Sequence, residues 1–488
     1  MYIRPIPAYR QAGIHPCSLT MAIVLLILFS AILLMLIIMT YRIHAISAKH
    51  TPGTEHPDES FTEKTAWIQG WIYAAIVLSI IAIIASIYFV VRGTPYEGHL
   101  LEWLNIVVRV MHITFGIAWI GASFYFVFLE NALNRTENVR DELAGNLWAV
   151  HGGGFYYLEK YKVAPKTIPK HLHWFKYEAY FTWLSGFGLL FIIYYFNASA
   201  MLIDTNVLKL SAAAAIGISM SSFIVAWLVY DLLCKSPLAK KPLLFALVGV
   251  FVLIAFAWLY SHIFSGRAAF IHFGAMLGSI MVANVFFVII PSQKAMVNAA
   301  KKGIPPDPSK GKKALFRSLH NNYFTLPVLF VMVSNHFPST FGNRYQWIVL
   351  AAITLGSAGI KHWLNLRERG QLSVWVMPAS VLLLLGVAYA TAPQPSNAKC
   401  KEVSFAEVNA IIQQRCIQCH SSRPTDDVYT APPNGVVYDT PLDIVKKKEL
   451  IMQRAVVTKT MPQNNKTNMT PEEREAIRCW IEQGAVVK

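Results

Sequence analysis

Charged residues are scarce in this chain of 488 residues, and acidic residues are the scarcer kind. Asp, Glu, Lys and Arg together make up 14% of the sequence, whereas hydrophobic residues make up 55%. Soluble domains carry about 25% charged residues, so this balance argues against a wholly soluble protein. The shortage of acids leaves a formal net charge of +16.

The basic excess lies mainly before residue 399. From there onward the chain has 13 Lys and Arg against 11 Asp and Glu. The excess therefore belongs to the apolar part, where basic residues gather in the loops that face the cytoplasm. We expect membrane lipid, and no nucleic acid, to be the partner of this charge.

Apolar runs long enough to span a bilayer recur through the first four fifths of the chain. A span needs about 20 mainly apolar residues as a helix. Ten such runs predict a polytopic helical membrane bundle in an all-α protein. They are 19–40, 67–91, 101–129, 174–198, 208–233, 242–263, 268–291, 322–338, 345–365 and 373–392.

One motif near the C-terminus carries specific chemistry. Cys416 and Cys419 are separated by two residues, and His420 follows at once. This CxxCH spacing is typical of covalent c-type haem, in which the thiols bond the macrocycle and the imidazole binds iron. A zinc site would need further nearby ligands, but no histidine follows His420 and Cys479 is the only later cysteine.

The residues around the motif predict a small class I cytochrome c domain. Ser404 and Glu407 form a capping box before a helix that runs up to the motif. Thr470 and Glu473 open a second, amphipathic helix, which Gly484 ends. A helix ending in CxxCH, a loop region and a closing helix is the plan of that domain.

The loop region should supply a sixth ligand to the iron. Met461 is the first choice, because Pro462 stiffens the loop and a thioether is the soft ligand that raises the reduction potential. Met469 and Met452 are the alternatives. Met452 fits a helical core pattern and Met469 directly precedes a helix cap.

Haem attachment predicts the topology. In bacteria it takes place on the periplasmic side, so the residues after 393 lie outside the cytoplasm. Counting back places the basic connections, such as 234–242 and 291–321, in the cytoplasm, as the positive-inside rule requires. A disulfide between Cys400 and Cys479 is one arrangement that this oxidising compartment allows.

This topology sorts the histidines of the membrane part into two layers. An outer layer would suit b-type haem, with imidazoles from different helices binding one iron. A weak internal repeat aligns His112 with His272 and favours that pair, with His336 as a further candidate ligand. The alternative is histidines that are hydrogen-bonded between helices. The outer layer is His112, His262, His272 and His336; the inner layer is His151, His171, His173, His320 and His362.

The inner layer suits a polar, anionic substrate. The HGGGF stretch at 151–155 predicts a flexible loop whose backbone amides approach a ligand closely. His320 and Asn321 follow Arg317 at a helix start, where the dipole also favours an anion. The alternative is an interfacial belt of lysines and aromatic residues.

Five ordered stretches resemble one family. They include HGGGF at 151–155, FSGRAAF at 264–270 and HNNY at 320–323, within 110–126, 148–155, 173–180, 264–272 and 320–336. From about Leu101 to its end the chain resembles the bacterial membrane-bound urate oxidases (urate hydroxylases) with a fused cytochrome c domain. The resemblance implies an eight-span core at 95–392 and a periplasmic cytochrome c domain at 393–488. The two spans in 1–94 fall outside the eight-span pattern of the family and form an N-terminal extension.

The resemblance also implies the activity. Urate would be oxidised to 5-hydroxyisourate with oxygen from water, and electrons would pass through the fused haem to a soluble or membrane cytochrome or a terminal oxidase. The protein would lie in the bacterial inner membrane. His320 or His151 would be the base, with Asn321 and Arg267 in the site.

The position of the site stays open between two places. Urate could bind at the cytoplasmic face, with a b haem between it and the c haem, or near Arg267, His272 and Asn284 toward the outside. A quinol:cytochrome c-type electron-transfer membrane protein is the alternative function. A permease or anchor carrying a cytochrome is a third interpretation.

Overall fold

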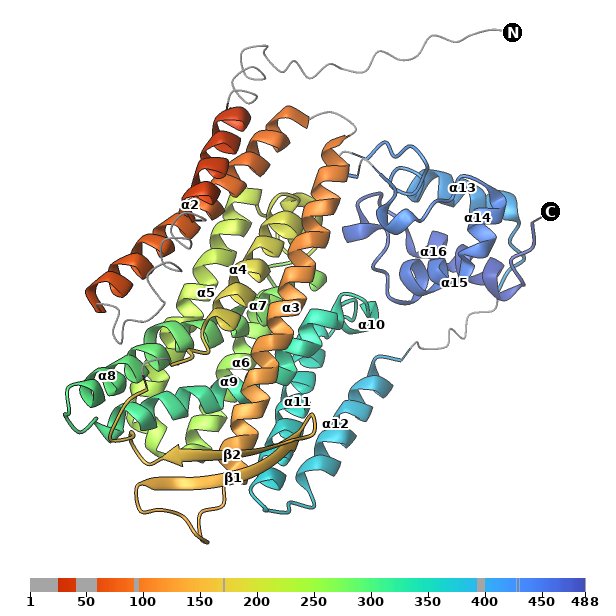
Figure 1. The fold of residues 1–488 in the computed structure, drawn as a ribbon. Helices are drawn as coiled ribbons and strands as arrows, with labels where there is room; N and C mark the ends of the chain where they lie inside the picture. Colours follow the sequence, from red (N-terminus) through yellow and green to blue (C-terminus); the bar gives the residue numbers. More distant parts are fainter. Residues whose placement is uncertain are drawn as a thin grey trace. The chain divides into compact units, whose positions relative to one another are not determined.

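The computed structural model describes residues 25–40, 59–91, 96–169, 172–392, 400–426, 428–429 and 431–487. His171 and the start of the first apolar run lie outside the described residues. The chain forms two compact units, Met1–Leu104 and Asn105–Lys488. The first contains helix Leu25–Thr40, α2 (Glu59–Val91) and the first turns of α3 (Tyr96–Ala132) (Figure 1).

The second unit consists mostly of apolar helices and a smaller C-terminal helical part. The apolar helices after α3 are α4 (Tyr177–Leu189), α5 (Ala212–Lys235), α6 (Pro242–Ser261), α7 (Gly266–Ala283), α8 (Ile290–Lys301), α9 (Pro308–Ser334), α11 (Gln346–Glu368) and α12 (Val376–Ala390). The π-helix η1 (Leu190–Tyr195) extends α4, and η4 (Asn284–Ile289) joins α7 to α8.

Six helices of the described chain are long and apolar enough to cross a membrane. They are Trp71–Val91, Tyr96–Ala132, Ala212–Lys235, Pro242–Ser261, Gly266–Lys301 and Gln346–Glu368.

The other four predicted spans are also helical where they are described. Helix Leu25–Thr40 and α12 are shorter, 174–198 is divided between α4 and η1, and 322–338 lies largely in α9. The helical character of the membrane part is confirmed, and ten crossings remain a prediction.

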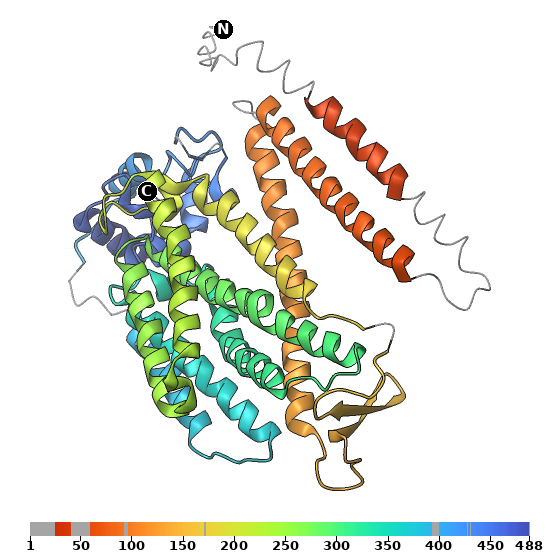
Figure 2. The same ribbon diagram turned by 90° about the vertical axis from the view of Figure 1, so that its left-hand side faces the viewer.

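Helix α7 is at the centre of the membrane part. It packs against α4, α5, α6 and α9, and its N-cap is Ser265, whose hydroxyl accepts from the Ala268 N–H. Gly274 allows a close approach to α9, because a Cβ there would lie 2.5 Å from Cγ1 of Val331. Figures 1 and 2 show the helices that surround α7.

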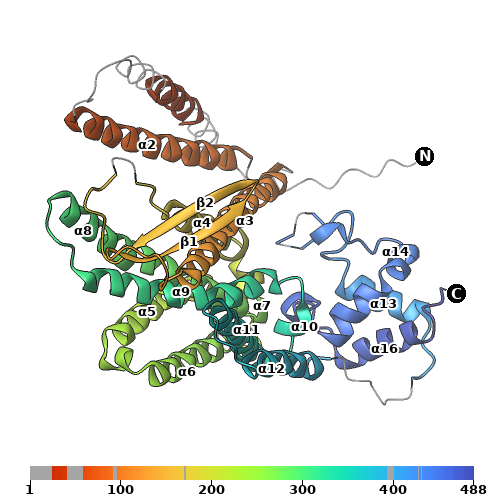
Figure 3. The same ribbon diagram turned by 60° about the horizontal axis from the view of Figure 1, so that its bottom comes forward.

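A β-hairpin corrects the all-α prediction. Strands β1 (Leu143–His151) and β2 (Gly154–Tyr161) pair antiparallel, and His151 lies opposite Gly154. Gly152 and Gly153 have φ of 58° and 79°, the left-handed conformation that a tight hairpin turn requires. HGGGF is therefore the turn of a hairpin and not a flexible loop. The hairpin lies at the end of α3 (Figure 3).

The C-terminal part has the order of elements that its sequence predicts. Ser404 caps α13 (Phe405–Arg415), and Thr470 with Glu473 forms the capping box of α16 (Pro471–Glu482). A disulfide joins Cys400 to Cys479 of α16. Shorter elements lie between: η5 (Pro433–Gly435), α14 (Pro441–Lys446), α15 (Lys448–Ile451), η6 (Met452–Val457) and η7 (Gln463–Asn465).

The ion pair between Arg415 and Glu473 makes this part sensitive to acid. Arg415 donates from Nε and Nη2 to the carboxylate, at 3.0 and 2.8 Å, and these bonds lower the pKa of Glu473. The charged carboxylate is thus favoured in the folded state. Its contribution is complete above the ordinary pKa of glutamate and is lost as pH falls through the lowered value.

Glu473→Gln should therefore destabilise the C-terminal part at pH 7 by about 1 kcal/mol and have little effect at low pH. The amide still accepts the Thr470 N–H, so the capping box is kept. Thermal unfolding of the full chain, followed by circular dichroism from pH 7 to pH 3, measures the difference. Glu402→Gln, at an exposed residue, is the control. An equal loss for the two variants at pH 7 would contradict this account.

Candidate functional site

The CxxCH motif folds into one turn beyond α13. The Cys416 N–H donates to the Ile412 carbonyl at 2.8 Å, and the His420 N–H donates to the Cys416 carbonyl at 2.9 Å. This turn places Cys416, Cys419 and His420 on the wall of one cavity of about 360 Å³, which we call the C-terminal cavity. Both thiols and the imidazole thus face the same space.

The His420 ring is held by one of its two nitrogens. Nδ1 lies 3.0 Å from the Val436 carbonyl oxygen, to which its N–H donates. Burial lowers the pKa of His420, which favours the neutral imidazole. Since Nδ1 carries the proton, Nε2 keeps its lone pair, which is the state required of an iron or zinc ligand.

Met461 is the one of the three candidate methionines that lines the C-terminal cavity. The Met461 N–H donates to the Arg454 carbonyl, and the Arg474 guanidinium donates to the Met461 carbonyl at 2.7 Å. Met469 is buried in the core of the C-terminal part. Two thiols, one imidazole and one thioether on an otherwise mainly apolar wall fit a covalent haem.

The C-terminal cavity is completed by residues of the membrane part. Ala200, Ile203 and Arg267 line it together with the motif. The Asn464 amide donates to the carbonyl oxygens of Ala200 and Ile203, at 3.1 and 2.6 Å. These bonds connect the loop that carries Met461 to the segment between η1 and α5.

A second cavity, of about 330 Å³, lies within the membrane part, and we call it the membrane cavity. Helices α3, α4, α7 and α9 and the π-helix η1 line it. Its surface is mainly apolar, and its polar lining residues include Arg109, His112, Tyr194, Asn335 and His336. His112 Nδ1 lies 2.9 Å from the Thr182 carbonyl oxygen.

A buried polar network connects α5, η4 and α9. Arg317 donates to Asp231 at 2.6 Å and to the Asn284 side chain at 3.3 Å. Asn284 donates to Asn321 at 2.8 Å and to the Tyr230 hydroxyl at 3.1 Å.

His320 completes this network. Its Nδ1 lies 2.8 Å from the Tyr230 hydroxyl, and its ring stacks on Phe245. We call Tyr230, Asp231, Asn284, Arg317, His320 and Asn321 the inner network.

The structure distributes the predicted site residues over several places. His320 and Asn321 are both in the inner network, while His151 is exposed at the hairpin turn. Arg267 lines the C-terminal cavity. Of the three histidines predicted to bind a b-type haem, His112 and His336 line the membrane cavity.

His272 lies elsewhere, inside a cluster of aromatic rings. It is fully buried, its Nδ1 bonds the Ala268 carbonyl, and the rings of Phe264 and Phe223 lie beside it. His112 and His272 therefore do not line a common cavity among those of the described residues.

Sequence reasoning missed Tyr230 and Asp231. A signal was present, because Asp231 is the only acidic residue in α5. A charge inside an apolar helix is costly and implies a partner, which here is Arg317. Tyr230 gave no such signal, since aromatic residues are common in membrane helices.

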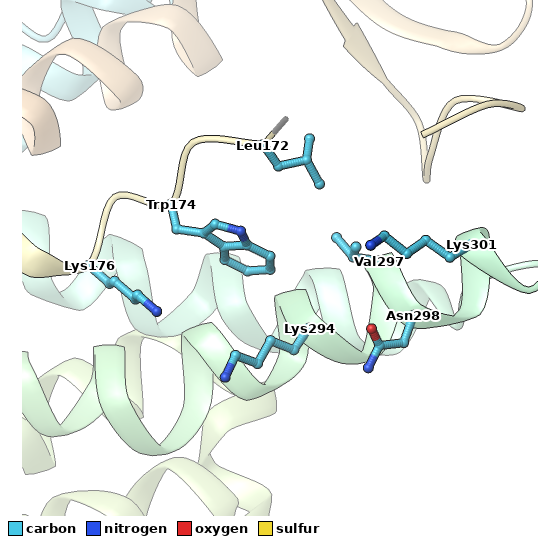
Figure 4. A pocket seen from close by; sticks show the side chains of 7 residues that line it. All are labelled: Leu172, Trp174, Lys176, Lys294, Val297, Asn298 and Lys301. Atoms are coloured by element: carbon cyan, nitrogen blue, oxygen red, sulfur yellow. The ribbon is translucent and has the colours of Figure 1, made fainter. Parts of the chain in front are cut away.

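A basic pocket of about 430 Å³ lies between the segment that precedes α4 and helix α8. Figure 4 shows the Trp174 ring between Lys176 and Lys301, with Lys294 below. Asn298 adds an amide. Three cations around an indole ring provide a surface for an anionic group at the membrane interface.

The buried ion pair of the inner network should dominate the stability of the membrane part. Asp231→Ala leaves the Arg317 guanidinium, 1% exposed, without its carboxylate, and such a loss costs about 3–5 kcal/mol. Lys235→Ala removes the exposed partner of the same carboxylate, at 2.5 Å, and should cost at most about 1 kcal/mol. The thermal midpoint and monodisperse yield in detergent measure both. Equal effects would refute the dominance of the buried pair.

Comparison with known proteins identifies the family. The comparisons found no matching curated protein and no matching solved structure. A family model described as urate oxidase N-terminal matches residues 98–392, which is more than half of the chain and contains the inner network and the membrane cavity. The six apolar helices are consistent with a membrane protein. The chain therefore belongs to the urate oxidase N-terminal family.

Proposed function

We propose that this protein oxidises urate to 5-hydroxyisourate and passes the electrons to a c-type haem in its own C-terminal part. Urate gains the oxygen of one water and loses two electrons, and two protons are released. The electrons leave to a soluble or membrane cytochrome or a terminal oxidase. The protein would lie in the bacterial inner membrane, crossing it ten times, with the C-terminal cytochrome c domain in the periplasm.

The family match at 98–392 carries this proposal. It supports urate as the substrate, and the C-terminal cavity supports the choice of acceptor. Cys416 and Cys419 would hold the haem covalently, while His420 and Met461 would bind its iron. The haem would supply a one-electron acceptor.

The inner network is our candidate for the urate site. Urate is a planar monoanion at neutral pH. Asp231 lies between Arg317 and Lys235, at 2.6 and 2.5 Å, so the cluster has one positive charge in excess. Asn321 and Tyr230 offer an amide and a hydroxyl for the polar edge of a purine.

His320 is the candidate base in this site. The Tyr230 hydroxyl fixes one ring nitrogen at 2.8 Å, and Phe245 and Phe316 hold the plane of the ring. A fixed imidazole near neutral pH accepts a proton from the attacking water. His151 is exposed at the hairpin turn, which makes it the weaker candidate.

Anaerobic addition of urate to the oxidised, purified chain tests the function. The c-haem band should become reduced, with two haems reduced for each urate consumed. His320→Gln should slow this reduction by about 10²-fold or more, the size of a general-base contribution. His362→Gln is the matched control, because His362 is exposed and bonds Tyr323 in the same layer.

The opposite outcomes are equally specific. If His320→Gln reduces haem as fast as the unchanged chain does, His320 is not the base. If urate leaves the haem oxidised while a quinol reduces it, the chain is a quinol:cytochrome c-type electron-transfer protein. The apolar membrane cavity is the observation that favours this second candidate.

Met461 can be tested without turnover. Met461→Ala should lower the reduction potential of the haem and remove the absorption that marks a sulfur–iron bond, because the thioether raises the potential. Met452→Ala is the control, since Met452 lies outside the C-terminal cavity. A spectrum and a redox titration measure both. An unchanged reduction potential in Met461→Ala would mean that another residue is the sixth ligand of the iron.

A further inference from the structure

The membrane cavity lies between the inner network and the C-terminal cavity. At one end Met281 lines it, and the Met281 carbonyl accepts from Asn321 of the inner network at 2.9 Å. At the other end Ile271 lines it, one turn along α7 from Arg267, which lines the C-terminal cavity. The cavity therefore adjoins both sites of the proposed reaction.

Its walls suit a flat ring of macrocycle size. Gly116, Gly186, Gly274 and Gly278 line it from three helices, so backbone forms part of the surface. A Cβ on Gly278 would meet no atom within 4 Å, which means that this position faces open space. The volume of about 330 Å³ is close to the 360 Å³ of the C-terminal cavity.

His112 is prepared as a metal ligand in the same way as His420. Its Nδ1 lies 2.9 Å from the Thr182 carbonyl oxygen, as that of His420 lies 3.0 Å from the Val436 carbonyl oxygen. If this N–H donates, Nε2 keeps its lone pair. The ring also packs on α4, since a Cβ at Gly186 would come within 2.8 Å of His112 Cε1.

Two further groups on the cavity wall complete the set. His336 follows α9 and its side chain has no hydrogen-bond partner in the part of the chain that the structure describes. Arg109 lies one turn before His112 and supplies a cation for an anionic substituent. His272 has no place in this set, because it lies outside the cavity.

We propose that the membrane cavity binds a b-type haem, with His112 as an iron ligand, His336 as the second ligand and Arg109 facing the haem carboxylates. The set combines an imidazole on α3, a second one just beyond the end of α9, a cation and glycine walls. An apolar site of this kind binds a non-covalent haem, because no cysteine lines it.

The role of this haem rests on the proposed function, whereas its presence does not. From His320 to Ser334, two residues before His336, α9 rises by about 21 Å at 1.5 Å per residue. One electron at a time would reduce the b-haem iron from the ferric to the ferrous state. The iron would return to the ferric state by passing that electron to the c haem.

Haem composition of the purified full chain is the test. The pyridine haemochrome separates b from c haem, because thioether bonds change the spectrum of the c type. We expect one b haem for each c haem in the unchanged chain. The b component should be lost in His112→Ala and in Gly278→Leu, which fills the cavity while keeping both histidines.

The covalent c haem of each sample shows whether the protein was made and assembled. His262→Ala is the control, since His262 is an exposed histidine of the same outer layer and does not line the cavity. It should keep its b haem. Loss in His336→Ala would support the second ligand.

Three outcomes overturn the proposal. They are c haem alone in the unchanged chain, b haem retained at full ratio in His112→Ala and Gly278→Leu, and a cavity occupied by a bound quinone in place of haem. A b haem that dithionite reduces and urate does not would support this inference and refute the proposed function. The two failures are therefore distinguishable.

Discussion

The ion pair between Arg317 and Asp231 is the constraint on which the interior of the membrane part depends. A guanidinium buried to 1% exposure needs a carboxylate and further hydrogen bonds. Asp231 and Asn284 supply them at 2.6 and 3.3 Å, and Asn284 continues to Asn321 and Tyr230. The hydrogen bonds that neutralise and solvate the Arg317 guanidinium therefore also hold α5, η4 and α9 together.

Asn284 occupies a special position in the backbone of this network. It begins the π-helix η4, where the helical ladder widens by one residue, and its side chain is fully buried. π-helical turns are common at functional sites. Asn321 of the same network donates to the carbonyl of Met281, a residue that lines the membrane cavity. The hydrogen bonds of the inner network therefore help to hold one wall of that cavity in place.

Sequence reasoning succeeded where the signal was local. The N-caps Ser404 and Thr470 placed the starts of α13 and α16, because each cap is made by residues within one turn. It failed at HGGGF, where three glycines were interpreted as a flexible loop. Two of them instead form the turn of a hairpin whose strands, rich in aromatic residues, pair over eight positions.

The sequence by itself determined the apolar helices and the CxxCH turn, because hydropathy, capping and short motifs depend on near neighbours. Only the tertiary structure decided which distant side chains meet. His112 and His336 line one cavity, while His272 is enclosed by aromatic rings, although the sequence predicts one outer layer for all three. Helix rotation and packing set that difference, and both depend on contacts between residues far apart in the chain.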